Sequence, residues 1–263
     1  MVRFGRVLAV AGISGLAVIM AACSSNDDQA DNPLGTVTAG ALTVCADAPY
    51  DPFEFEDPST ESGYSGFDID LTGAIAKKLG LKLVVQDTDF AAVQSGAAMT
   101  ANQCDLGASA ITITPERQAN LDFTDPYYNS LQSLLVKTDS GIQSLDDLAD
   151  KRIGVQRTTT GETYANEHKP ASAEVISFPS DGELWTASQA GQVDALLQDF
   201  PINKVHEDDD PAYTVVAKYE TDESYGFAMV KGKNPELLAK INAALQELRD
   251  DGEYQTLYDH YFG

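Results

Sequence analysis

The 263-residue chain contains few of the residues from which catalytic and metal centres are usually built. It has three cysteines, three histidines and one tryptophan. The histidines stand apart, and the sequence has no HExxH pair, Cys/His cluster, nucleophile elbow or glycine-rich phosphate loop after a strand. The sequence therefore predicts no metal site, no nucleotide site and no cofactor.

Positive charge is also scarce. Seventeen Lys and Arg residues face 41 Asp and Glu residues, which gives a formal net charge of −24. If Arg3 and Arg6 are removed with a leader, the charge becomes −24 − 2, about −26. Nucleic acids and anionic lipid surfaces both require a basic face, so this composition argues against either as an electrostatic partner.

Long hydrophobic runs are limited to the N-terminus. Arg3 and Arg6 precede an uninterrupted run of apolar and small residues, Val7 to Met20. This run is shorter than the roughly 20 residues that a membrane span needs. A basic start followed by a short apolar segment is typical of an export signal.

The end of this segment indicates how the exported chain is held. Met20-Ala21-Ala22-Cys23 is similar to the lipobox of bacterial lipoproteins, although Met20 stands where Leu is usual. We expect a signal peptide over 1–22, and a lipidated (palmitate-bearing) Cys23 with a flexible tether over 23–39. The protein would then be lipid-anchored on the outer face of the cytoplasmic membrane. Ordinary cleavage after an alanine is the alternative.

Two cysteines remain after Cys23 is set aside. Cys45 and Cys104 each lie in or beside an expected buried strand. An even pair in an oxidising compartment suits a disulfide, but the sequence does not show the required geometry. A disulfide and two buried thiols both stay open.

From Leu42 onward, short buried-type strands alternate with amphipathic helices. Such alternation predicts α/β architecture, with parallel sheets covered by helices on both faces. The charged run 206–210 (HEDDD) is expected to be a solvated loop. The expected strands are 42–46, 81–85, 105–110, 133–137, 153–155, 174–178, 193–197 and 226–230. The expected helices are 67–79, 90–101, 145–149, 162–168, 181–190, the segment from Asn234-Pro235 to Gly252, and 253–262.

Ligands of parallel sheets gather beyond the carboxyl ends of the strands. Several side chains follow such strand ends and are candidates as a set: Asp47, Tyr50, Phe90, Ser109 and Thr112.

Arg117 is unusual because it lies in the first turn of an expected helix. Thr114 suits the N-cap and Pro115 the first helical position. A helix N-terminus favours anions, so an arginine there fits a bound carboxylate or phosphate. A surface ion pair with Glu116 or a nearby Asp is the alternative.

Two further sites follow strands in the second half. The threonine-rich segment 158–160 precedes a helix and offers hydroxyl groups and free amides to an anion, with a simple helix cap as the alternative. Asp199 follows a strand as well. It is either the N-cap of the next helix or a residue that faces the cleft.

The ordered motifs resemble the extracytoplasmic solute-binding proteins of polar amino acid ABC transporters, family 3. The matching segments cover nearly the whole chain after the tether. They are PYDPFEF (49–55), GYSGFDIDLTGAIAKKLGL (63–81), ASAITITPER (108–117), LDFTDPYY (121–128), GVQRTTTGETYA (154–165), GQVDALLQD (191–199), YGFAMVKG (225–232) and LRDDGEYQTLYDHYFG (248–263).

This resemblance implies an α/β, two-lobe periplasmic-binding-protein fold (type II). Each lobe would be a mostly parallel sheet flanked by helices, and two crossing strands near 127–131 and 221–225 would join the lobes. Lobe 1 would comprise 40–127 plus 224–263, and lobe 2 would comprise 128–223. The lobes would close on ligand like a hinged trap.

The resemblance also implies roles for the site. Arg117 would bind the ligand α-carboxylate with Thr112 and Thr160, and Asp199 would bind the α-ammonium group with Thr112 and the carbonyl of Ala110. Tyr50 and Phe90 would enclose the side chain. The ligand-binding set is Asp47, Tyr50, Phe90, Ser109, Ala110, Thr112, Arg117, Gln156, Thr159, Thr160 and Asp199.

Two positions decide ligand class and loop shape in this resemblance. Asp47 would lie at the far end of the pocket, and both this position and that of Gln156 vary with ligand class. A carboxylate there suits Gln, Arg, Lys or His, and a strand-end cap is the alternative. Thr158 departs from the pattern because many family members have Gly at this position.

The resemblance implies a non-enzymatic, monomeric receptor that delivers a polar or basic amino acid to an ABC permease complex. Two other functions would use the same scaffold. One is a cyclohexadienyl dehydratase-like enzyme, which needs a general acid at the leaving hydroxyl. The other is the ligand-sensing subunit of a signalling receptor.

Overall fold

A computed structural model describes residues 32–263. The expected signal peptide, the lipidation site Cys23 and the tether up to Asp31 lie outside the described residues. None of the helices between Asn32 and Gly263 combines the length and apolar character that a membrane crossing requires.

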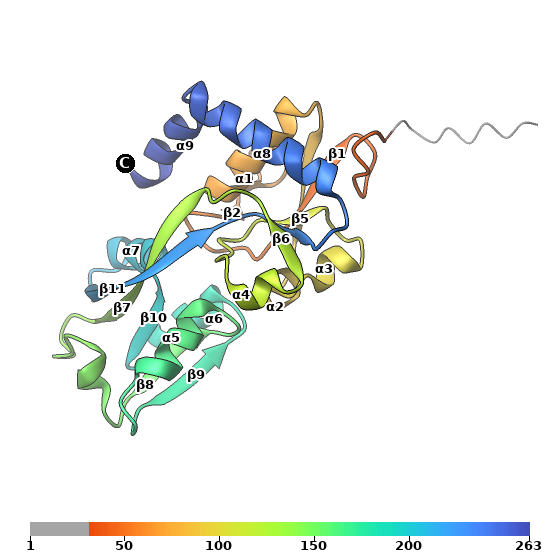
Figure 1. Cartoon of the computed structure of the whole chain (residues 1–263). Helices are drawn as coiled ribbons and strands as arrows, with labels where there is room; N and C mark the ends of the chain where they lie inside the picture. The colour runs from red at the N-terminus through yellow and green to blue at the C-terminus, as the bar shows by residue number, and fades with distance from the viewer. Residues whose placement is uncertain (1–31) are drawn as a thin grey trace, which may run out of the picture. The chain divides into compact units, whose positions relative to one another are not determined.

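The first sheet has five strands in the order β4-β1-β5-β12-β6 (Figure 1). Its centre is β1, Ala41–Ala46, in which every residue is buried. β1 pairs in parallel with β4 (Lys82–Asp87) and β5 (Leu106–Gly107), as the alternating pattern predicts. β12 (Ala228–Val230) is antiparallel to β5 and to β6 (Leu121–Phe123) because the chain enters it on its return from the second sheet.

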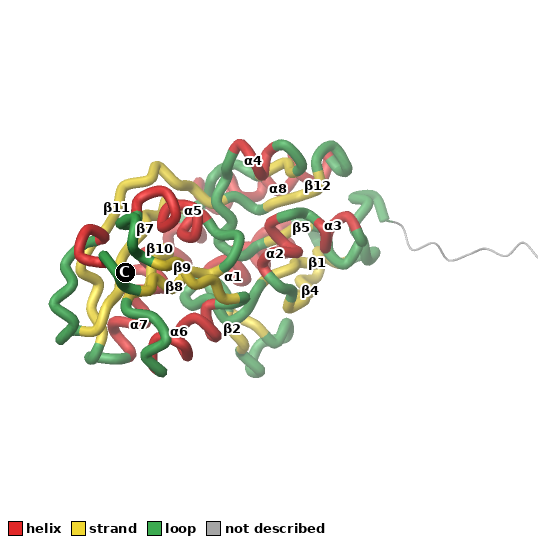
Figure 2. Tube along the Cα trace, turned by 90° about the horizontal axis from the view of Figure 1, so that it is seen from below, coloured by secondary structure: helices red, strands yellow, loops and turns green. Residues whose placement is uncertain are grey.

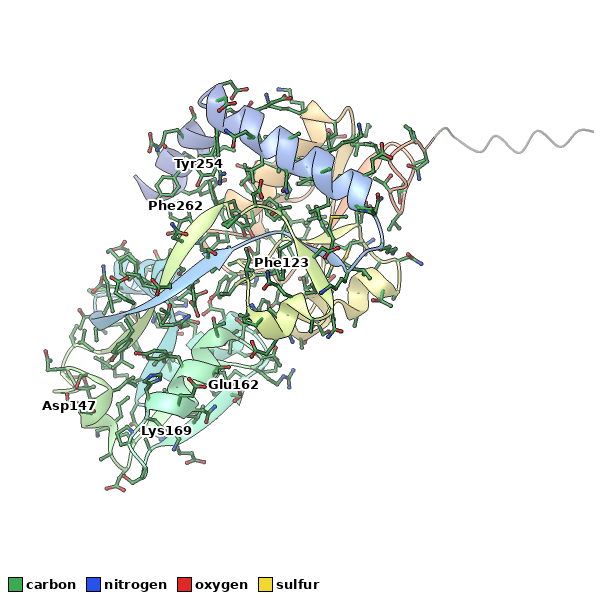
Figure 3. All side chains as sticks on the ribbon, in the orientation of Figure 1. Phe123, Asp147, Glu162, Lys169, Tyr254 and Phe262 are labelled. Atoms are coloured by element: carbon green, nitrogen blue, oxygen red, sulfur yellow. A yellow bond between two sulfur atoms is a disulfide. The ribbon has the colours of Figure 1, made fainter. Side chains whose placement is uncertain are left out.

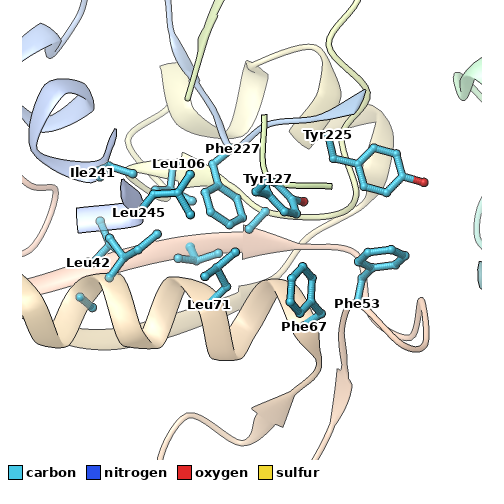
Figure 4. Packing of buried hydrophobic residues seen from close by; sticks show 14 of the residues in the cluster. Leu42, Phe53, Phe67, Leu71, Leu106, Tyr127, Tyr225, Phe227, Ile241 and Leu245 are labelled. Atoms are coloured by element: carbon cyan, nitrogen blue, oxygen red, sulfur yellow. The ribbon is translucent and has the colours of Figure 1, made fainter. Parts of the chain in front are cut away.

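Helices cover both faces of this sheet. On one face, α1 (Phe67–Lys78) and α8 (Pro235–Asp250) bury an apolar cluster that includes Leu42, Leu71 and Ile241 (Figure 4). On the other, α2 (Phe90–Gln94) and α3 (Ala97–Thr100) lie beside β1 and β5 (Figure 2). A disulfide joins Cys45 and Cys104 in the apolar cluster between these two helices and the sheet. The two cysteines are therefore paired and are not free thiols.

The second sheet has the order β11-β7-β10-β8-β9. Its parallel part consists of β8 (Arg152–Gln156), β9 (Glu174–Phe178) and β10 (Ala195–Asp199). Successive side chains of a strand point to opposite faces, so the second sheet has an apolar cluster on each face. On one face, Leu134 and Leu197 pack with α5 (Thr160–His168). On the other face, Leu135 and Leu196 pack with α6 (Asp181–Gln189).

Two long antiparallel strands of the second sheet extend toward the first sheet in Figure 1. β7 is Tyr128–Lys137 and β11 is Tyr213–Tyr225. Tyr128 is paired with Tyr225, and their rings stack with centroids 5.5 Å apart. The remaining elements are β2 (Phe55–Glu56), β3 (Tyr64–Ser65), α4 (Pro115–Gln118), the 3-10 helix η1 (Leu145–Leu148), α7 (Phe200–Asp209) and α9 (Glu253–Phe262), whose Tyr254 and Phe262 are labelled in Figure 3.

Two expected elements in the first half are wrong in extent. The single helix expected over 90–101 is divided into α2 and α3 by Gly96, which has a φ of +78°. The strand expected over 105–110 pairs only over Leu106–Gly107. Beyond Gly107 the chain turns toward the cavity described below, with Ala110 at a φ of +47°.

The solvated loop expected over 206–210 is also wrong, because most of it belongs to α7. His206 is buried, donates a hydrogen bond to Asp181 (3.0 Å) and stacks on Trp185 with ring centroids 4.2 Å apart. Ile202 and His206 are four residues apart, so they lie on one face of the helix. Because acids follow His206 in the sequence, the pattern did not indicate a buried helix face.

Candidate functional site

A cavity lies where the carboxyl ends of β1, β5, β8 and β10 meet. Both sheets therefore contribute to it, as expected for ligand sites beyond strand ends. The structure brings the whole set of sequence-predicted site residues to this cavity. Its lining is Asp47, Tyr50, Phe90, Ser109, Ala110, Thr112, Arg117, Gln156, Thr159, Thr160 and Asp199.

Arg117 is held by the short helix α4. The Thr114 hydroxyl accepts a hydrogen bond from the Arg117 amide (3.2 Å), so Thr114 is the predicted N-cap. The guanidinium donates to Thr112 O (2.9 Å), Thr158 O (3.1 Å) and Gln94 Oε1 (3.3 Å). The Thr158 carbonyl belongs to the second half of the chain, so Arg117 connects the two sides of the cavity.

No carboxylate of residues 32–263 lies within 4.0 Å of the Arg117 guanidinium, which excludes the alternative ion pair with Glu116 in this structure. Burial lowers the Arg117 pKa to about 10, which still leaves the group protonated at neutral pH. Among the described contacts, one N–H on each terminal nitrogen stays available. Two such donors match the two oxygens of a carboxylate.

Asp199 supplies the opposite charge. It ends β10 and stands at the N-cap position of α7, yet its side chain makes no cap hydrogen bond. Its carboxylate instead accepts hydrogen bonds from Tyr225 Oη (2.6 Å), Tyr50 Oη (3.2 Å) and Gln132 Nε2 (2.5 Å). Burial raises the Asp199 pKa to about 7, and nearby Glu223 acts in the same direction.

Sequence reasoning missed Gln132 and Tyr225. Gln132 is fully buried, and its amide also donates to Glu223 Oε2 (2.9 Å). A signal for Gln132 existed, because a glutamine interrupts the apolar run of β7 and a buried amide needs partners. Tyr225 gave no comparable signal, since an aromatic residue in a strand usually indicates core packing.

Asp47 and Gln156 meet across the other end of the cavity. Gln156 Nε2 donates to Asp47 Oδ2 over 2.8 Å. Among residues 32–263, no backbone N–H donates to the Asp47 side chain, so the strand-end cap is not formed. Burial raises the Asp47 pKa to about 7, and the carboxylates of Asp89 and Asp87 add to the shift.

Phe90 and Tyr50 contribute aromatic surface to the cavity lining. The Arg117 guanidinium carbon is 5.5 Å from the Phe90 ring centroid, which is within cation–π range. Tyr50 is turned toward Asp199 by its hydroxyl group. The two rings therefore lie beside the two opposite charges of the site.

The segment Ser109-Ala110 forms part of the lining and is held from behind by two buried acids. Ser109 Oγ donates to Glu54, and the Ala110 amide donates to Asp68 Oδ2 (2.9 Å). Tyr127 Oη donates to the same Asp68 oxygen over 2.6 Å. Burial raises the pKa of Asp68 to about 7 and that of Glu54 well above its usual range. Neither acid was predicted from the sequence as a site residue.

The threonine-rich loop leads into α5. Thr159 is the N-cap and accepts a hydrogen bond from the Glu162 amide (3.1 Å). Thr160 Oγ1 lies 3.4 Å from Thr112 Oγ1, which belongs to the other side of the cavity. Thr158 has a φ of +64°, the backbone conformation that glycine adopts most easily.

This arrangement suits recognition of a small zwitterion. A buried cation with spare N–H donors and a buried carboxylate face one cavity, and a second carboxylate lies at another part of the wall. Within residues 32–263, no group of His, Cys, Asp and Glu side chains could hold a metal ion.

Similarity to known proteins identifies the family of this chain. Residues 42–263 match the family model of the bacterial extracellular solute-binding proteins, family 3. The chain is 33% identical to the arginine-binding extracellular protein ArtP of Bacillus subtilis, over 84% of this chain and 86% of that protein. It is 34% identical to the ABC transporter glutamine-binding protein GlnH of the same organism, over 78% and 75% of the two chains.

Solved structures give the same result. An ancestral arginine-binding protein bound to glutamine superposes with a TM-score of 0.79 at 36% identity, covering 86% of this chain and 99% of that one. The α/β fold with two sheets is that of the periplasmic amino acid-binding proteins. The chain belongs to the bacterial extracellular solute-binding proteins, family 3.

Proposed function

We propose that residues 32–263 bind one amino acid in the cavity and deliver it to an ABC importer outside the membrane. The observation that carries this proposal is the pairing of Arg117 and Asp199 around one cavity. Within the described part of the chain, Arg117 keeps N–H donors and has no carboxylate partner, and the groups that donate to the buried Asp199 are all neutral. A zwitterion would match both buried charges, and an unmatched buried charge is costly.

Asp47 suggests the ligand class. Its carboxylate accepts one hydrogen bond from Gln156, and a ligand side chain with N–H donors would give it a second. The ligand is then a polar or basic amino acid, with glutamine, arginine, lysine and histidine as the candidates. Relatives that are named for arginine and for glutamine support this range.

Closure of two lobes would bury the ligand. Lobe 1 would comprise 40–127 plus 224–263 and lobe 2 would comprise 128–223, with β7 and β11 as the connection. Arg117 with Thr158, and Thr112 with Thr160, are the contacts that this motion would make and break. Binding energy drawn from both lobes would favour the closed state.

The protein would act at the outer face of the cytoplasmic membrane as a monomer tethered through lipidated Cys23. Because so acidic a chain is not attracted to anionic lipid, the acyl chain would hold it at the membrane. A sensor subunit would use the same cavity and differ only in its partner.

We infer a binding role and no catalytic one. A dehydratase needs an acid poised to protonate a leaving hydroxyl group. The cavity-lining acids are Asp47 and Asp199, and both have charge-pairing tasks in the proposed complex. Incubation with prephenate should therefore give no dehydrated product.

The test is a thermal-shift screen of residues 32–263 against the twenty amino acids with ornithine, citrulline and cystine, followed by calorimetry on the hits. A ligand at a hundredfold excess over Kd adds about 2.7 kcal/mol to stability, which a melting curve resolves. A shift with glutamine or a basic amino acid supports the proposal. A shift with acidic or apolar amino acids alone would reject the role given to Asp47, and a flat screen would reject amino acid binding.

A further inference from the structure

Thr158 has a backbone conformation that its residue type disfavours. Its φ of +64° places it in the left-handed region, where a side chain branched at Cβ is an outlier. Such a conformation persists only where the surrounding contacts hold it, and it is found preferentially at functional sites. The contacts that hold Thr158 are therefore informative.

Glu162 provides the first contact. This residue extends from the first turn of α5 (Figure 3), and its Oε2 accepts a hydrogen bond from the Thr158 amide over 2.6 Å. Its other oxygen accepts a hydrogen bond from Ser177 Oγ on β9. Glu162 is thus fixed at both oxygens, which makes it a rigid support for the loop.

This contact differs from an ordinary helix cap. In a capping box, the acid at the third helical position accepts a hydrogen bond from the amide of the N-cap residue itself. Thr159 is the N-cap here, but Glu162 binds the amide of the preceding residue, Thr158. The support therefore acts on the left-handed residue and not on the helix end.

Arg117 provides the second contact. The Thr158 carbonyl accepts a hydrogen bond from Arg117 Nη2 over 3.1 Å. With Nη1 bound to Thr112 O and Nε to Gln94, the guanidinium is fixed at three points. This fixation orients the two N–H groups that the proposed function gives to the ligand carboxylate.

We propose that Glu162 is a positioning residue for ligand binding. It holds Thr158 in the left-handed conformation, which directs the Thr158 carbonyl across the cavity to Arg117. Glu162 would not touch the ligand and would act only through Thr158 and Arg117. The inference rests on the proposed function for its affinity readout, but the held conformation can be measured without ligand.

The test is a double-mutant cycle with Glu162→Ala, Thr158→Gly and the double variant, measured by calorimetry and by stopped-flow dissociation. Glu162→Ala should weaken binding about tenfold, mainly through faster dissociation, because the carbonyl no longer fixes Arg117. Glu162→Gln retains an acceptor oxygen and should recover most of the affinity. Thr158→Gly should bind within about threefold of wild type, since glycine adopts this conformation without strain.

The cycle distinguishes positioning from a general structural effect. In the Thr158→Gly background, Glu162→Ala should cost clearly less than in wild type, because the strained residue is gone. Glu167→Ala, which removes an exposed acid from the same helix, is the matched control and should bind as wild type does. Equal costs of Glu162→Ala in both backgrounds, or a Glu162→Ala variant within threefold of wild type, would overturn the proposal.

A ligand-free measurement separates this inference from the proposed function. Amide hydrogen exchange at Thr158 should accelerate at least tenfold in Glu162→Ala, with the α5 amides unchanged. Unaltered exchange at Thr158 would reject the support role, whatever the ligand is. If no amino acid binds to wild type, the proposed function fails, while accelerated exchange would still establish that Glu162 holds Thr158.

Discussion

Replacement of Arg117 by alanine tests the charge pairing on which ligand binding depends. The substitution removes a buried cation, and a bound carboxylate would then lie in the cavity without a partner. Breaking a buried ion pair by deleting one member costs about 3–5 kcal/mol. If the wild-type Kd is about 1 μM, or about −8.2 kcal/mol, the variant should retain only about −3 to −5 kcal/mol.

The assay is titration calorimetry at millimolar ligand, with circular dichroism to establish folding. Arg157→Ala is a matched control, because this arginine is half-exposed on the same loop as Thr158 and lies 3.9 Å from Asp89. An exposed pair of this kind contributes about 1 kcal/mol or less. A folded Arg117→Ala variant that binds within about tenfold of wild type, or 1.4 kcal/mol, would refute the carboxylate assignment.

Three further predictions concern pH, the disulfide and the support of Asp199. Because burial raises the Asp199 pKa from 3.8 to about 7, the folded chain keeps a proton that the unfolded chain loses in that window. The melting temperature of the ligand-free protein should therefore fall as the pH rises from about 4 to about 7. It should fall less steeply in the Asp199→Asn variant. Replacing Cys45 and Cys104 together by alanine opens a loop of 59 residues. The double replacement should lower the free energy of unfolding in urea by about 2–5 kcal/mol and leave the ligand Kd within about threefold of wild type. Unchanged stability would contradict this prediction. Tyr225→Phe removes a donor to Asp199 and should weaken binding by about 1.5–3 kcal/mol in calorimetry, while an unchanged Kd would show that this donor is dispensable.

The parts of the site that the sequence predicted have strong local signals. Arg117 stood out because a cation in the first turn of a helix opposes the helix dipole. Asp47 and Asp199 were each expected after a strand, so parallel pairing alone placed each of them at the carboxyl edge of its own sheet. The alternation of elements predicted the sheets for the same reason, since each strand and helix carries its own periodicity.

The parts that the sequence did not predict depend on contacts between distant segments. Gln132 reaches Asp199 over a separation of 67 residues, and Asp68 reaches Ala110 over 42 residues. The local sequence does not show which distant residue such a buried acid or amide contacts. The same limit explains His206, whose partner Asp181 lies 25 residues away on another helix.

The charges that line the cavity determine whether a neutral or a cationic amino acid is favoured. With Arg117 protonated and both Asp47 and Asp199 ionised, the lining carries a net charge of one negative unit. A bound zwitterion leaves this net charge unchanged, whereas a bound monocationic amino acid neutralises it. Since the Asp47 pKa is about 7, this balance depends on pH in the neutral range. At lower pH Asp47 holds a proton and the neutral ligand is favoured.

Arginine and glutamine have the same α-groups, so the titration of Asp199 cancels in the ratio of their Kd values. The Kd for glutamine divided by the Kd for arginine should therefore rise by up to about ninefold between pH 6 and pH 8. Over this range the ionised fraction of Asp47 rises from about 0.1 to about 0.9. Calorimetry at the two pH values gives the ratio directly. In Asp47→Asn the ratio should be small and independent of pH. A pH-dependent ratio that survives this substitution would show that another group reads the ligand's side-chain charge.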